Sequence, residues 1–109
     1  MPVVLISTWS EMTPEQYEQM VELTNWNSDP APGALLHLAA FEDGELHVVD
    51  IWESAEHYQR FIEERVMPLA QAAGMTSGPD VHIYPIHNLS TPGFAPIETR
   101  SAVDRMGGA

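Results

Sequence analysis

The chain has 109 residues, with sixteen acidic residues against four arginines, no lysine and no cysteine, and a formal net charge of −12. This length suits one domain with one modest core. The charge balance argues against nucleic acids and anionic membranes as partners, and the missing residue types exclude P-loop, Schiff-base, thiolate and Cys-ligated metal chemistry. We find no apolar run of membrane-spanning length and no signal region, so we expect a cytoplasmic protein.

The first part of the chain predicts a strand, a helix and a loop. Residues 3–9 are rich in β-branched side chains, which favours a strand. The run TPEQ at residues 13–16 is typical of a helix start, because Thr13 can cap the helix and Gln16 completes a capping box. Residues 25–33 contain two prolines and predict a loop. The predicted helix face carries Tyr17, Met20, Val21 and Thr24.

A β-hairpin is predicted next. Residues 34–42 and 45–53 form two apolar runs separated by Asp43-Gly44, which is a strong signal for a tight hairpin turn. A two-residue turn fixes which side chains lie opposite one another, at a Cβ separation of about 5 Å. The opposed pairs then include His37 with Asp50 and Leu35 with Trp52.

A second helix, a last strand and a tail complete the chain. Ser54 is expected to cap the helix, Pro68 to kink it and Gly74 to end it. Residues 81–86 predict the last strand, which closes a domain expected at residues 1–88. Gly, Pro, Ser and Thr dominate after that, so an irregular tail is expected over residues 89–109. Its candidate anchors onto a partner are Leu89, Phe94 and Ile97.

The order of elements predicts an α+β fold of the ferredoxin-like β-α-β-β-α-β type, with an antiparallel four-stranded sheet in the order 4-1-3-2 and two helices on one face. Strand alternation separates an aliphatic face from a mixed face that combines apolar, aromatic and polar side chains. We expect the aliphatic face to meet the helices. The mixed face should then pair with a second copy of the chain, line a ligand pocket, or do both. The aliphatic face has Val4, Ile6, Leu36, Leu38, Val49 and Ile51, and the mixed face has Leu5, Ser7, Trp9, His37, Phe41, Asp50 and Trp52.

The predicted catalytic pair is His37 and Asp50. An opposed carboxylate can fix the tautomer of an imidazole and so create a general base or acid. The same pair can instead serve only to satisfy two polar groups at an interface, and both interpretations stay open at this stage. The expected substrate-binding residues are Ser7, Trp9, Phe41 and Trp52, with Tyr84 added if the last strand turns it toward this face.

Metal ions and cofactors are not expected. His37, His82 and His87 lack the spacing of metal ligands. His47 is expected on the helix-facing side, and His57 in the first turn of the second helix. The acidic side chains along both helices are typical of solvated faces.

The chain resembles the dimeric α+β barrel superfamily, and within it the antibiotic-biosynthesis-monooxygenase-like (ABM) domains. The resemblance covers residues 2–88 and depends on the order of elements, the step Trp52-Glu53-Ser54 into the second helix, and the aromatic residues Tyr58 and Phe61. It implies a homodimer formed through the sheet face. It also implies relatives that include cofactor-free oxygenases of polyketide quinols, haem-degrading enzymes, lactone isomerases and proteins without known activity.

Carried onto this chain, the resemblance makes Trp52 an aromatic pocket residue and His37 the base that deprotonates a phenolic substrate. Haem-degrading relatives use a histidine in or near the second helix, where only His57 is available and lies too early. We therefore expect a homodimeric enzyme, a cofactor-independent monooxygenase or isomerase of a small aromatic or enolic molecule. The alternative is a non-catalytic ligand-binding or accessory homodimer in which the His–Asp pair is structural.

Overall fold

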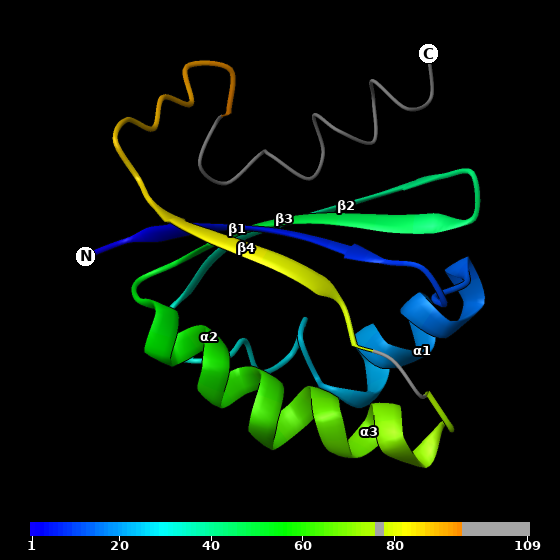
Figure 1. Ribbon diagram of the computed structural model, residues 1–109. Coiled ribbons are helices and arrows are strands. Elements are labelled where there is room, and N and C mark those ends of the chain that lie inside the picture. Colours follow the sequence, from blue (N-terminus) through cyan, green and yellow to red (C-terminus); the bar gives the residue numbers. More distant parts are fainter. Residues whose placement is uncertain (76–77, 95–109) are drawn as a thin grey trace.

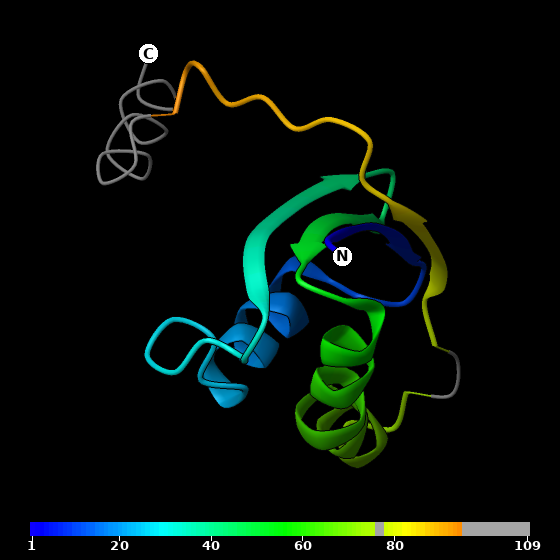
Figure 2. The same cartoon turned by 90° about the vertical axis from the view of Figure 1, so that its left-hand side faces the viewer.

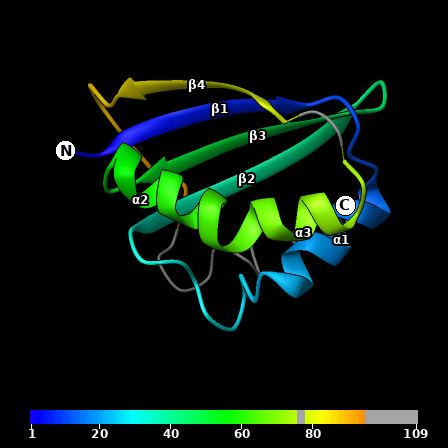
Figure 3. The same cartoon turned by 60° about the horizontal axis from the view of Figure 1, so that its bottom comes forward.

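Four antiparallel strands form one sheet in the order β2-β3-β1-β4, which confirms the expected strand order (Figures 1 and 3). The computed structural model describes residues 1–75 and 78–94. Its strands are β1 (Val3–Trp9), β2 (Ala34–Glu42), β3 (Glu45–Trp52) and β4 (Asp80–Pro85). Its helices are α1 (Pro14–Leu23), α2 (Ala55–Phe61) and α3 (Met67–Ala72), with a π-helical turn η1 (Ile62–Val66) between the last two.

The start of α1 has the predicted capping box. The backbone N–H of Gln16 donates to Thr13 Oγ1 at 3.1 Å, and the backbone N–H of Thr13 donates to Gln16 Oε1 at 2.9 Å. These bonds satisfy two backbone N–H groups that have no partner within the helix. The helix ends at Leu23, and Asn25 follows with a left-handed φ of 58°. The chain thereby turns into the loop over residues 25–33.

The hairpin turn sets the register of β2 and β3 as expected. Asp43 and Gly44 have φ values of 52° and 78°, as a tight type I′ turn requires. His37 consequently lies opposite Asp50. The expected pairing of Leu35 with Trp52 is wrong, because the register shifts between Ala34 and Leu36 and places Ala34 opposite Trp52. Leu35 is the extra residue of this irregularity, and its side chain is 55% exposed.

The second helical region runs from α2 through η1 to α3 as one rod, which lies below the sheet in Figure 1 and in front of it in Figure 3. Ser54 caps it, since its Oγ accepts the backbone N–H of His57 at 3.2 Å. The irregularity expected at Pro68 takes the form of η1, in which the N–H of Met67 donates to the carbonyl oxygen of Ile62, five residues earlier. A proline lacks an N–H and its ring crowds the carbonyl four residues before it, so a wider turn just upstream accommodates it.

The two faces of the sheet are the reverse of our expectation. The helices cover the mixed face, where Leu5, Leu46 and Trp52 are each at most 2% exposed. The aliphatic face is open on the other side (Figure 2), and there Ile6 and Leu38 are 46% and 57% exposed. Both faces are apolar enough to be buried, so alternation separates them without deciding which one meets the helices. The large rings of Trp9 and Trp52 fill the space between sheet and helices.

The chain after β4 passes to the open side of the sheet (Figures 1 and 2). Leu89 and Phe94 are 57% and 52% exposed there, while Ile97 lies outside the described residues. Their contact with a partner stays a prediction. Within residues 1–75 and 78–94, no helix has the length and apolar character needed to cross a membrane.

Candidate functional site

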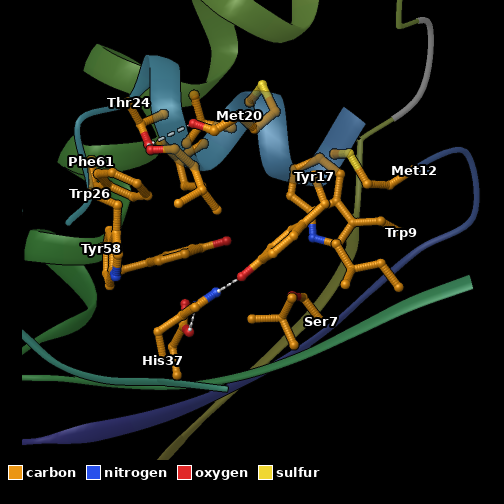
Figure 4. Close-up of a pocket in the computed structure, with 16 residues that line it drawn as sticks. Ser7, Trp9, Met12, Tyr17, Met20, Thr24, Trp26, His37, Tyr58 and Phe61 are labelled. Atoms are coloured by element: carbon orange, nitrogen blue, oxygen red, sulfur yellow. Dashed lines mark hydrogen bonds and ion pairs between the residues drawn. The ribbon is translucent and has the colours of Figure 1, made fainter. Parts of the chain in front are cut away.

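A pocket lies between the helices and the sheet face that they cover (Figure 4). Its free volume is about 90 Å³. One side of the pocket is formed by the sheet and by Met12, which lies between β1 and α1. The other side is formed by α1, the 25–33 loop and the α2–η1 segment. The lining residues are Ser7, Trp9, Met12, Tyr17, Met20, Val21, Thr24, Trp26, His37, Leu46, Val48, Asp50, Tyr58, Phe61, Ile62 and Val66.

His37 and Asp50 are hydrogen-bonded at the sheet wall of this pocket. His37 Nδ1 lies 2.6 Å from Asp50 Oδ1, because β2 and β3 place the two residues directly opposite one another. The second carboxylate oxygen of Asp50 accepts the indole N–H of Trp52 at 3.3 Å. Asp50 is 6% exposed, so this carboxylate is held in place from both sides and away from bulk water.

Tyr17 is hydrogen-bonded to the other nitrogen of the His37 imidazole. Its hydroxyl oxygen lies 2.6 Å from His37 Nε2 (Figure 4). The two rings are stacked, with centroids 6.0 Å apart and an angle of 9° between their planes. Burial raises the pKa of Tyr17, and the negative charges of Glu18 and Asp50 raise it further. The residue is therefore a phenol at neutral pH and can donate its proton to His37.

The partners indicate which groups donate and which accept along the chain Tyr17–His37–Asp50 when the imidazole is neutral. A carboxylate only accepts hydrogen bonds, so His37 donates through Nδ1. The neutral imidazole then has a lone pair on Nε2, which accepts the Tyr17 hydroxyl. This arrangement satisfies all three side chains and orients them for proton transfer.

Trp26 closes the pocket from the 25–33 loop. Its ring centroid lies 5.2 Å from that of His37 and 5.3 Å from that of Phe61. Arg65 holds the loop from η1, since its Nη1 donates to the carbonyl oxygens of Asp29 at 2.6 Å and Thr24 at 3.3 Å. The guanidinium thus supports the pocket wall without lining the pocket.

Tyr58 contributes a second phenol. Its hydroxyl points into the pocket in Figure 4, and it makes no hydrogen bond with the residues that the structure describes. Burial raises the pKa of Tyr58 strongly, and the charge of Asp50 adds to this effect. The hydroxyl remains protonated at neutral pH and is available as a hydrogen-bond donor to a bound molecule.

Some of the predicted site residues line the pocket and others do not. His37, Asp50, Ser7 and Trp9 line the pocket. Trp52 is fully buried behind it and contacts Asp50. Phe41 lies outside the pocket, with its ring 6.0 Å from that of Tyr17 at an angle of 82°. The condition set for Tyr84 is not met, because the last strand turns it away from the pocket.

Tyr84 lies on the open face of the sheet. It pairs with Val4 and is 52% exposed, stacked on His82. A residue of β4 faces the same way as its partner in β1, so the side chain of Tyr84 points away from the helices. His47 was expected to face the helices, and it too lies on the open face, opposite Thr8 and Ala40.

Sequence reasoning missed Tyr17, Trp26 and Tyr58 as pocket residues. Tyr17 was recognisable on the inner face of the first helix, and Tyr58 on that of the second. Trp26 gives no periodic signal because it belongs to a loop. His57 does not line the pocket; its Nδ1 lies 2.6 Å from Ser54 Oγ. Among the described residues, no three His, Asp or Glu side chains gather as a metal site would require.

Comparison with known proteins gives matches in structure only. No family model and no curated protein matches the sequence. SnoaB, a cofactor-independent oxygenase from Streptomyces nogalater, aligns with a TM-score of 0.61 and 17% identity, over 84% of this chain and 97% of its own. The chain has the fold of the ABM proteins. A protein from Nitrosomonas europaea with the provisional name antibiotic biosynthesis monooxygenase aligns with a TM-score of 0.62 and 12% identity, over 83% of this chain and 94% of its own.

A third structure with the same fold is Rv0793 from Mycobacterium tuberculosis. It aligns with a TM-score of 0.61 and 12% identity, over 84% of this chain and 100% of its own. At these identities the likeness establishes the ferredoxin-like architecture that the order of elements predicted. The chemistry of the site has to be argued from its own residues.

Proposed function

We propose that this pocket binds a small, uncharged aromatic or enolic molecule and that the His37–Asp50 pair exchanges a proton with it. The reaction would be a monooxygenation that uses no cofactor, or an isomerisation. The observation that carries the proposal is the 2.6 Å contact between His37 Nδ1 and Asp50 Oδ1 at the wall of an aromatic-lined cavity. A group held in this way is suited to general acid–base catalysis.

The pocket favours a single small ring. Its free volume of about 90 Å³ is well below the range of roughly 300–1,000 Å³ found for sites that hold drug-sized ligands. Trp9, Trp26 and Phe61 offer flat apolar surfaces to such a ring. Among the residues that the structure describes, no arginine lines the pocket and Asp50 is the single carboxylate that does, so these side chains favour an uncharged ligand over an anionic one.

A proton transfer is the step that a cofactor-free oxygenation needs from the protein. Removing a proton from a phenol or an enol gives an electron-rich anion, which can react directly with molecular oxygen. In an isomerisation, the same proton would return at another carbon. The ABM fold and its cofactor-independent member SnoaB support the oxygenase version of the proposal.

The alternative is that the His37–Asp50 pair is structural and that the protein binds a ligand without converting it. The chain of bonds from Tyr17 to Trp52 satisfies every polar atom involved, as a structural network would. The two functions differ in what His37→Ala does to turnover.

Oxygen uptake with a panel of one-ring phenols and quinols tests the proposal. We expect uptake by the wild type, and a fall in kcat of at least about 100-fold in His37→Ala, the usual scale for loss of a general base. His87→Ala is the matched control, since His87 is exposed and lies beyond the sheet. Equal turnover by wild type and His37→Ala would refute the proposed mechanism.

We also propose that a second copy of the chain covers the open face of the sheet. Across this face, Ile6 lies beside Val49, which in turn lies beside Leu38, so apolar side chains form a continuous row over three strands. A row of this kind is complementary to itself under a two-fold axis. Burial of Ile6 and Leu38, both about half exposed in one chain, would drive the association.

A further inference from the structure

We propose that Tyr17, rather than His37, is the group that meets the bound molecule and exchanges the proton with it, while His37 and Asp50 act behind it as a relay. This inference rests on the proposed function and assigns a catalytic role to a residue of α1 outside the His–Asp pair. It is carried by the order in which the three side chains are hydrogen-bonded.

Both nitrogens of His37 are already engaged. Nδ1 is 2.6 Å from Asp50 Oδ1, and Nε2 is 2.6 Å from the Tyr17 hydroxyl oxygen. A substrate proton could reach Nε2 directly only if Tyr17 moved away. Tyr17 also lines the pocket, and its hydroxyl oxygen has lone pairs left to accept a proton while its own proton points to His37.

Tyr17 is held in this position by its neighbours. It lies in the first turns of α1, directly after the Thr13–Gln16 capping box. Its ring stacks on His37 and meets the ring of Phe41 edge-on at a centroid distance of 6.0 Å. Phe41 does not line the pocket, and its contact with the site is this packing against Tyr17.

The transfer balances without an ionised tyrosine. The bond between the substrate oxygen or carbon and its hydrogen breaks, and a new O–H bond forms on Tyr17. The original O–H bond of Tyr17 breaks at the same time, and its proton forms an N–H bond on His37 Nε2. The products are a substrate anion and an imidazolium next to the Asp50 carboxylate, and no electrons have moved to or from the protein.

This route also fits the environment of the phenol. Burial and the charges of Glu18 and Asp50 raise the pKa of Tyr17, so a free tyrosinate would be costly to form. A relay in which one proton arrives as another leaves avoids that state. The positive charge that results is placed on His37, where Asp50 stabilises it.

The proposal narrows the substrate class to neutral molecules with an acidic O–H or C–H group that can approach a phenol. 4-Nitrophenol is a suitable probe, because it has one ring and its ionised form is yellow. We expect the wild type to bind it and to turn it yellow at a pH where the free probe is mostly colourless. Tyr17→Phe should bind it within about tenfold of wild type, the range of one neutral hydrogen bond, without the colour change.

The variants His37→Ala and Tyr84→Phe complete the experiment. His37→Ala should also lose the colour change, and Tyr84→Phe, altered on the open face, should keep it. If Tyr17→Phe keeps the colour change and His37→Ala loses it, the role of Tyr17 is refuted and the proposed function stands. If wild type does not bind the probe, or binds it without ionising it, both proposals fail.

A crystal structure of wild type with the probe decides the matter without any variant, should Tyr17→Phe fold poorly. We expect the phenol oxygen within hydrogen-bond distance of Tyr17 Oη, with the Tyr17–His37 bond retained. A phenol oxygen bonded to His37 Nε2, with Tyr17 displaced, would overturn the proposal.

Discussion

The imidazole ring of His57 lies directly against the α-carbon of Gly33. A Cβ atom added to Gly33 would come within 2.5 Å of His57 Cγ, and Gly33 has a left-handed φ of 87°. The carbonyl oxygen of Gly33 also accepts the backbone N–H of Glu53 at 2.8 Å. The end of the pocket loop is thereby fixed to the start of the second helix.

Gly33→Ala is expected to lower the free energy of unfolding by more than the cost of placing a side chain at a left-handed φ. A side chain in the left-handed region costs about 1–2 kcal/mol, and the clash with His57 adds to it. Gly44→Ala is the matched control, since Gly44 has a φ of 78° with no atom within 4 Å of the added Cβ. Urea unfolding should show a larger loss for Gly33→Ala, and His57→Ala should recover part of it. Equal losses at the two glycines would contradict the close contact.

The His37–Asp50 pair should show strong coupling in a double-mutant cycle. Removing either partner leaves His37 Nδ1 or Asp50 Oδ1 without its hydrogen bond in a mostly buried site, so each single substitution carries the cost of the whole contact. We expect the free energies of unfolding of His37→Ala, Asp50→Ala and the double variant to give a coupling of about 1–3 kcal/mol. Additive effects would mean that the 2.6 Å contact has little energetic weight.

Stability should fall at alkaline pH because of the two pocket phenols. Tyr17 and Tyr58 have pKa values raised by burial above the ordinary 10.0. The unfolded chain therefore loses these protons first as pH rises, so the stability they contribute is full below pH 10.0 and is lost above it. Urea unfolding between about pH 8 and 11 should show this decline, reduced in Tyr58→Phe. Tyr84→Phe should decline as wild type does.

Association through the open sheet face is tested with Leu38→Glu. Each two-fold interface would contain the substitution twice, so the two introduced charges should weaken dimerisation at least about tenfold. Analytical ultracentrifugation over a range of concentrations measures this change. Leu23→Glu is the control, because Leu23 is equally exposed, at 58%, but lies on α1. A monomeric wild type at all concentrations would reject the proposed interface.

Arg65→Ala should loosen the wall of the pocket. Loss of the bonds from Arg65 to the loop carbonyls is expected to cost about 2 kcal/mol and to expose Trp26. Acrylamide quenching of tryptophan fluorescence should rise, and Trp26→Phe should remove that rise. Arg60→Ala provides the control, since Arg60 is exposed and has no such bonds to the described residues. Unchanged quenching in Arg65→Ala would show that the loop is held by other contacts.

Local signals in the sequence predicted most of the fold. Asp43-Gly44 fixed the hairpin register and with it the His37–Asp50 pair, and Thr13 with Gln16 fixed the start of α1. The register shift at Leu35 has no comparable signal in the sequence, because a bulge depends on how the end of the strand packs against the rest of the fold. Local sequence signals were therefore sufficient to predict how β2 pairs with β3, but not to predict the irregularity at the start of β2.

The site was harder to predict because it depends on which sheet face meets the helices. Both faces are apolar, and the buried His–Asp pair is compatible with the helix side only because Tyr17 provides it with a partner from α1. That contact joins residues twenty positions apart and depends on the rotation of a helix, which strand alternation does not report. For the same reason, strand alternation could not decide which face of the sheet Tyr84 lies on.

The shape of this pocket depends on the number of residues in the π-helical turn η1. Phe61, Ile62 and Val66 line the pocket, while Arg65, in the same turn, reaches the loop. Deleting one residue of the turn would restore a regular α-helix but rotate everything after it by about 100°. Homologous chains can therefore be expected to vary in the size and polarity of these side chains more readily than in their number, so a gap in an alignment at residues 62–66 would mark proteins with a differently shaped site.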